Sequence, residues 1–177
     1  MGRWTILLVA ILVISQACDP ADTGPGAETL KAPIVNGQAE SGWSAVGALT
    51  MQYPGYGYGG SFCTGTLVAS QWVLTAAHCL TAEEEGFSPV PQTTMFYVGS
   101  DANPGPSGWP SSGSLYQVDQ FFVHPSYDED VMGDHDIALM HLADPVSGVT
   151  PIGLNAAYMS GAWVGAEIFY VGFGVVA

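Results

Sequence analysis

The chain has 177 residues, of which 48% are hydrophobic and 10% are charged, so it is long enough for one domain with a sizeable core and too apolar for a disordered protein. Lysine and arginine together number 2 against 16 acidic residues, which gives a net charge of −14. This balance argues against nucleic acid as a partner and against direct binding to anionic membrane surfaces, because both need cationic side chains.

Residues 1–17 have the pattern of a signal peptide. Arg3 supplies the positive charge, residues 4–14 are apolar except for Thr5, and small residues end the stretch at Ala17. The apolar stretch is too short to cross a bilayer, which needs roughly 20 residues. We therefore expect an exported protein that is periplasmic, anchored at the cell surface or extracellular.

Cys18 follows this segment directly and resembles the lipid-attachment cysteine of bacterial lipoproteins, although Ser15 stands where a leucine is usual. Lipidation at Cys18, ordinary signal cleavage nearby and an uncleaved anchor all stay open. Membrane attachment is expected only through a lipidated Cys18. Residues 18–33 contain three prolines and no apolar period, so we expect a linker or pro-segment before a domain over residues 34–177.

Two further cysteines, Cys63 and Cys79, remain if Cys18 is lipidated or removed. Export implies an oxidising compartment, so we expect these two to form one disulfide. Two unrelated buried thiols are the alternative.

From Ile34 onward the pattern predicts an all-β domain. Short apolar runs alternate with stretches rich in glycine and proline, and no window shows a sustained helical period. Residues 53–61 and 101–114 are two such turn-rich stretches, and residues 76–80 allow a single helical turn. The expected strands are 46–52, 64–70, 71–77, 94–100, 115–123, 136–142 and 166–174.

His78 has the surroundings of a pre-positioned base, because it ends an apolar run and precedes Cys79. The other three histidines have simpler interpretations. His124 lies in a turn before a proline, His135 is expected at the surface, and His141 is expected to face solvent from its strand.

We expect no metal ion. A zinc site built from His78, His135 and Asp136 needs ligands that converge tetrahedrally, and the spacing gives no reason for this. The acidic run Glu83–Glu85 is interpreted as a solvated loop rather than a calcium site.

Three short motifs follow one another along the chain, and their order and spacing are informative: Ile34–Gly37 (IVNG), Ala76–Cys79 (AAHC) and Asp134–Leu139 (DHDIAL). Residues 72–75, 123–127 and 172–174 add weaker matches around them. From Ile34 to its end the chain resembles the trypsin-like serine endopeptidases of the chymotrypsin fold. The resemblance implies the first six-stranded antiparallel barrel of a double β-barrel and the beginning of the second barrel.

The resemblance also implies roles for single residues. His78 is the expected general base and Asp136 the carboxylate that orients it, acting on protein or peptide substrates without a cofactor. Ile34 is the expected N-terminus after activation, although Pro33 precedes it where relatives carry arginine or lysine. If Cys18 is lipidated, a cut before Ile34 would release the domain from its anchor.

The nucleophilic serine of this family has no counterpart in the sequence. It should follow Asp136 by roughly 90 residues, and neither Ser147 nor Ser160 stands in the Gly-Asp-Ser-Gly-Gly pattern of the family. We therefore expect a peptidase domain that is incomplete at its C-terminus and inactive by itself. A non-catalytic peptidase-like binding module and a half-enzyme completed by another chain are the alternatives, and the retention of His78 and Asp136 favours the enzyme.

Overall fold

The computed structural model describes residues 41–53, 55, 57–81, 88–131, 134–158 and 160–173. The expected signal peptide and linker, with Cys18, lie outside these residues, as do Ile34 and Glu83–Glu85. Within the described ranges, no helix combines the length and the apolar character that crossing a membrane requires.

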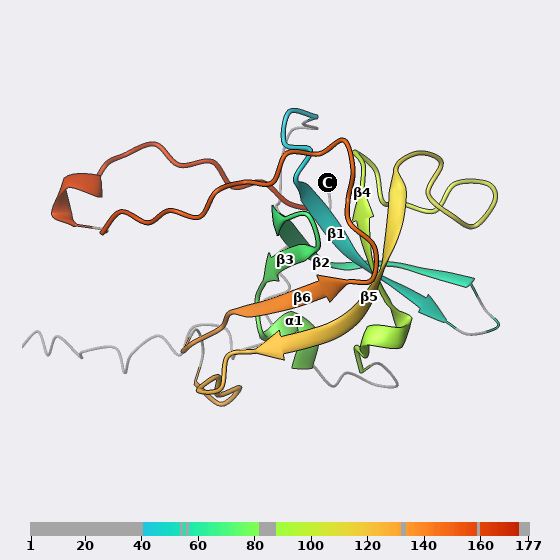
Figure 1. Cartoon of the computed structure of the whole chain (residues 1–177), viewed down its shortest axis with the longest axis horizontal. Helices are drawn as coiled ribbons and strands as arrows, with labels where there is room; N and C mark the ends of the chain where they lie inside the picture. Colours follow the sequence, from blue (N-terminus) through green and yellow to red (C-terminus); the bar gives the residue numbers. More distant parts are fainter. Residues whose placement is uncertain are drawn as a thin grey trace, which may run out of the picture. The chain divides into compact units, whose positions relative to one another are not determined.

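Six strands form a closed antiparallel barrel (Figure 1). Their order around the barrel is β1-β2-β3-β6-β5-β4, and the barrel closes because β4 pairs with β1. Closure gives each of the six strands a partner on both sides over at least part of its length. The prediction of an all-β domain with a six-stranded barrel is confirmed. The strands are β1 (Val46–Tyr53), β2 (Gly57–Ala69), β3 (Trp72–Thr75), β4 (Thr94–Val98), β5 (Ser114–Val123) and β6 (Ala138–Leu142).

Three short helical segments accompany the strands. The α-helix α1 (His78–Thr81) follows β3, and it agrees with the single helical turn expected there. The 3-10 helix η1 (Pro91–Thr93) precedes β4, and the 3-10 helix η2 (Gly161–Trp163) lies in the segment after β6.

The barrel interior is filled by side chains that alternate along each strand. On β6, Ala138, Met140 and Leu142 are buried, whereas His141 points outward and is partly exposed. This is the period of two that an antiparallel strand gives. The largest fully buried members of the interior cluster are Leu49, Leu67, Val73, Phe96, Val118, Met140 and Leu142.

A second, smaller cluster involves β1 and β4. Ala48, Tyr97 and Ala102 are buried there, and Phe173 packs against them with its ring 5.9 Å from that of Tyr97. Strand β1 pairs with both β2 and β4, and six consecutive residues of it are buried, with Leu49 in the interior cluster and Ala48 in the second one. The end of the described chain is thereby attached to the barrel.

Strand β2 begins earlier than the sequence suggested. Residues 57–61 were expected in a turn, yet they pair with β1, with Gly57 opposite Tyr53 and Tyr58 opposite Gln52. A Cβ atom at Gly59 would collide with the Tyr53 ring unless that ring moved, so glycine lets the ring lie against the strand. Pairing with a neighbouring strand has outweighed the low strand propensity of glycine.

The segment after β6 is attached at its beginning and exposed further on. Backbone bonds join Val146 to Ser70 and Ile152 to Leu67. In Figure 1 the chain then leaves the barrel, carries η2 and returns. The strand predicted over 166–174 is not formed in the described residues 166–173, because no described strand pairs with it. Seven large hydrophobic side chains are exposed in this segment: Leu154, Tyr158, Trp163, Val164, Ile168, Phe169 and Tyr170.

Leucine-to-alanine substitutions can compare how much the barrel and the segment after β6 contribute to the free energy of unfolding. Leu67 is fully buried and Leu154 is 68% exposed. We expect Leu67→Ala to lower the free energy of unfolding by about 2–5 kcal/mol, because it leaves a cavity. Leu154→Ala should change it by no more than about 0.5 kcal/mol. Urea titrations give both values, and equal losses would show that the barrel interior is not the stabilising core.

Candidate active site

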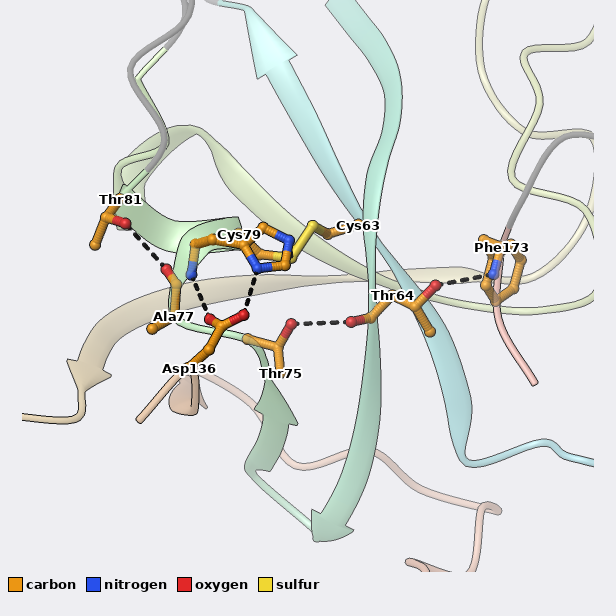
Figure 2. Close-up of a disulfide and its surroundings, with 9 residues drawn as sticks. Cys63, Thr64, Thr75, Ala77, Cys79, Thr81, Asp136 and Phe173 are labelled. Carbon is orange, nitrogen blue, oxygen red and sulfur yellow. Dashed lines mark hydrogen bonds and ion pairs between the residues drawn. A yellow bond between two sulfur atoms is a disulfide. The ribbon is translucent and has the colours of Figure 1, made fainter. Parts of the chain in front are cut away.

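His78 is the first residue of α1 and lies just after strand β3. The last residue of β3, Thr75, donates its hydroxyl to the Thr64 carbonyl of β2 at 2.9 Å. The residue after His78, Cys79, is buried and forms a disulfide with Cys63 of β2 (Figure 2). The backbone at His78 is therefore fixed by a paired strand before it and by a covalent bond after it.

Pairing of β3 with β6 brings Asp136 to the same place. In the antiparallel register Thr75 lies opposite Ala138, so the residues that leave β3 and those that lead into β6 lie at one end of the strand pair. His78 follows Thr75 and Asp136 precedes Ala138. Two residues that are 58 positions apart in sequence thereby become neighbours.

Asp136 contacts His78 at two points. One carboxylate oxygen, Oδ2, lies 2.7 Å from the imidazole Nδ1, and the other, Oδ1, accepts the backbone N–H of His78 at 2.9 Å. This N–H belongs to the first turn of α1 and therefore has no acceptor within the helix. The carboxylate fixes both the ring and the backbone of His78.

These contacts determine the charge of the carboxylate and the proton position on the ring. Burial alone would raise the pKa of Asp136, but the hydrogen bonds from the backbone and ring of His78, the His78 charge and the Ala77 amide outweigh it, so the pKa is lowered. An ionised carboxylate only accepts hydrogen bonds. The shared proton therefore lies on Nδ1 of His78, and Nε2 keeps its lone pair for use as a base.

Thr64 joins this region to the end of the described chain. Besides its carbonyl bond from Thr75, its Oγ1 accepts the backbone N–H of Phe173 at 2.9 Å (Figure 2). Phe173, which belongs to a segment singled out in the sequence, thus reaches the strand that carries Cys63. Thr64 itself was not predicted, because a threonine within a strand has no distinguishing sequence pattern.

His141 is more enclosed than the sequence suggested. Its side chain is 25% exposed, its ring lies 4.8 Å from that of Trp72, and its Nδ1 lies 2.7 Å from Oδ1 of Asp119. The expectation of a solvent-facing residue is only partly met. The aromatic contact depends on the pairing of β3 with β6, which periodicity along one strand does not specify.

His124 and His135 lie together near Asp136. His124 begins a turn, as expected, and its carbonyl accepts the N–H of Tyr127 at 2.9 Å. The side chain of His135 is 45% exposed and its ring stacks on that of His124, with centroids 4.6 Å apart and planes inclined by 13°. No sequence pattern predicts this stack.

Among the described residues, three side chains of types that can bind metals lie close together: Cys63, His78 and Cys79. The two sulfur atoms are bonded to each other, so neither is a thiolate that could bind a metal. His135, which the sequence analysis had considered as a ligand, instead places its Nδ1 2.7 Å from Oδ1 of Asp134.

In the described ranges, no hydroxyl group is hydrogen bonded to the His78 imidazole. Its Nδ1 contacts Asp136, and its Nε2 lies 3.5 Å from the sulfur of Cys79. Ser147 and Ser160 are both exposed. The His78 side chain is itself 59% exposed, which leaves it open to a further group.

An acidic depression of about 300 Å³ lies at the C-terminal end of α1. It is lined by Thr81 of the helix and by Tyr127, Asp128, Glu129 and Asp130 of the segment after β5. Three carboxylates here give this surface a local negative potential.

The lowered pKa of Asp136 makes a prediction about acid stability. Because the folded-state value lies below the unfolded value of 3.8, the contribution of Asp136 is present above 3.8 and is lost as the pH falls through the folded-state pKa. The difference in unfolding free energy between wild type and Asp136→Asn should therefore be larger at about pH 5 than at about pH 3. Urea unfolding at both pH values tests this. An unchanged difference would show that the ionised Asp136 carboxylate does not add to the free energy of unfolding.

Comparison with known proteins agrees with the all-β barrel. The family model for trypsin matches residues 34–176. A trypsin of Phaedon cochleariae is 33% identical over 147 residues, which are 82% of this chain and 49% of that protein. A trypsin of Simulium vittatum is 33% identical over 84 residues, which are 48% of this chain and 28% of that protein.

An ovochymase of Halocynthia roretzi is 25% identical over 118 residues, which are 64% of this chain and 7% of that protein. The chain thus spans about half of the first of these relatives and less of the other two. The family match covers most of the sequence and includes the barrel, His78 and Asp136. The chain belongs to the trypsin family.

Proposed function

We propose that this chain carries the general base and the orienting carboxylate of a serine endopeptidase. His78 Nε2 takes the proton of a serine hydroxyl as the oxygen attacks a peptide carbonyl, and later returns that proton to the leaving amine. Asp136 holds the proton on Nδ1 in the resting state and stabilises the imidazolium formed between the two steps.

The two-point contact between Asp136 and His78 is the observation that carries this proposal. A short distance alone would not be enough, because His141 and Asp119 are also 2.7 Å apart. In that pair the described contacts join the carboxylate to the ring only. At His78 the second oxygen also holds the backbone, so the ring is aimed as well as paired.

The nucleophile would come from residues other than those described here. Their expected sequence is the Gly-Asp-Ser-Gly-Gly pattern, which does not occur among the 177 residues. The imidazole of His78 is exposed, and the large apolar side chains exposed after residue 153 are compatible with further protein packing on that segment. By itself the chain is expected to be poorly soluble and inactive.

Family membership and the Cys63–Cys79 disulfide support an exported protein that acts on proteins or peptides. Periplasmic, surface-anchored and extracellular locations all fit. We further propose that lipidated Cys18 anchors a precursor and that a cut before Ile34 activates and releases it.

Two alternatives make different predictions. A half-enzyme would recover activity when a second polypeptide supplies the serine. A non-catalytic binding module would not recover activity in this way. Such a module also has no need of a carboxylate that is hydrogen bonded to both the ring and the backbone of His78, which argues against it.

A chimera tests the enzymatic proposal. Residues 34–171 are joined to the remaining part of the Phaedon cochleariae trypsin, so that Ile34 is the N-terminus as in the proposed activated form, and hydrolysis of a peptide ester is measured. We expect activity in the chimera, a loss on the order of 10⁶-fold in kcat for His78→Ala, and a loss on the order of 10⁴-fold for Asp136→Asn. Asp119→Asn is the matched control, because it removes the partner of the other histidine, and it should leave kcat unchanged.

Two results would count against this proposal. Burst release of product by the unextended chain, abolished by His78→Ala, would show that a nucleophile is already present. A folded chimera whose rate is the same with and without His78 would favour the binding module.

Processing can be tested separately in cells that express the full chain. We expect the unprocessed chain in the membrane fraction and the form that starts at Ile34 in the soluble fraction, because no other cysteine outside the disulfide is available for lipid attachment. Fractionation with N-terminal sequencing gives the answer. The proposal is overturned if the Ile34 form stays with the membrane, or if Cys18→Ala leaves the distribution of the precursor unchanged.

A further inference from the structure

The chain takes an unusual backbone conformation just before Asp136. His135 has a φ of 53°, and it is the one non-glycine residue with positive φ among those described. This left-handed region is disfavoured for residues with a side chain, although histidine, asparagine and aspartate enter it more often than most. Such a conformation persists only where the surrounding structure holds it in place.

Asp136 is the middle residue of a tight turn. The N–H of Ile137 donates to the carbonyl of His135 at 2.7 Å, which is the bond of a three-residue turn. The direction of the Asp136 side chain is therefore decided by the residues on both sides of it.

His124 holds both of these neighbours. Its backbone N–H donates to the carbonyl of Ile137 at 3.1 Å, and its ring stacks on that of His135 at 4.6 Å. His124, which directly follows β5, thus contacts His135 before Asp136 and Ile137 after it.

The two rings are themselves oriented by hydrogen bonds. The Nδ1 of His124 accepts the N–H of Ser126 at 3.2 Å, and the Nδ1 of His135 lies 2.7 Å from Oδ1 of Asp134. Both Nδ1 atoms have partners, and the group of candidate metal ligands found among the described residues lies at Cys63, His78 and Cys79, so the stack is not interpreted as a metal site.

We propose that His124 and His135 are positioning residues for the catalytic pair, and that their ring stack keeps His135 in the left-handed conformation that presents Asp136 to His78. This inference depends on the proposed function in one respect: the proposed function assigns Asp136 the role of the carboxylate that orients His78. The stack is partly exposed, with His135 at 45%, so it is not required to fill the barrel core.

Two measurements on the full chain report the contact directly and need no enzymatic activity. The first is hydrogen exchange of the His78 amide, whose acceptor is Oδ1 of Asp136. The second is the pH titration of the Asp136 carboxyl carbon by NMR. Loss of the contact should speed exchange and move the carboxyl titration upward, because the hydrogen bonds that lower the pKa are weakened.

We expect His124→Ala and His135→Ala each to speed exchange of the His78 amide about threefold to tenfold, the range that an aromatic pair supports. The double variant should be little worse than either single variant, since both remove the same stack. His124→Phe, which keeps a flat ring and the backbone N–H but loses the Nδ1 acceptor, should speed exchange less than His124→Ala does. His141→Ala is the matched control, because it removes the histidine of the other His–Asp pair.

The proposal is overturned if either alanine variant, shown to be folded by its thermal unfolding transition, leaves both measurements as in the wild type. It is also overturned if the effects of the two substitutions simply add, or if His141→Ala has the same effect. Should His135→Ala not fold, His135→Gly replaces it, because glycine adopts positive φ without strain but lacks the ring. Faster exchange in that variant supports the stack, and unchanged exchange overturns it. Failure of the chimera to hydrolyse substrate would leave these results unaffected.

Discussion

The candidate site depends on one carboxylate that makes two bonds. Asp136 holds the ring of His78 through Nδ1 and its backbone through the N–H at the start of α1. A carboxylate that accepted only the ring proton would leave the imidazole free to swing with its backbone. With both bonds made, the lone pair of Nε2 has a fixed direction, which is what proton transfer to and from a reacting group requires. The disulfide and the Thr75–Thr64 bond hold the segment on which this arrangement is built.

The barrel supplies this geometry through strand pairing. Because β3 and β6 are antiparallel neighbours with Thr75 opposite Ala138, the chain leaving one strand meets the chain leading into the other. The pairing is long-range in sequence, so the site exists only in the folded barrel. A closed barrel with its own filled interior can keep that register, even though the segment after residue 153 exposes many large apolar side chains.

Two histidine–aspartate pairs on one barrel show why distance alone does not define a function. The ring nitrogen and the carboxylate are 2.7 Å apart in both pairs. The His141–Asp119 pair packs against Trp72 on the outer side of the strands, where it adds polar and aromatic contacts between β3, β5 and β6. The His78–Asp136 pair differs in the second carboxylate bond, in the disulfide beside it, and in the turn that His124 and His135 hold on the other side of Asp136.

The sequence by itself determined the all-β class, most strand positions and the two residues of the candidate pair, because alternation of apolar residues and short motifs are local signals. It did not determine the early start of β2, where glycines pair with β1, or the absence of a strand in residues 166–173, because strand formation depends on a partner. The bond from the His78 backbone to Asp136, the link from Thr64 to Phe173 and the stack of His124 on His135 were decided by tertiary structure alone. Each joins residues whose proximity arises from the closure of the barrel, and no local pattern in a single chain encodes the register in which distant strands pair.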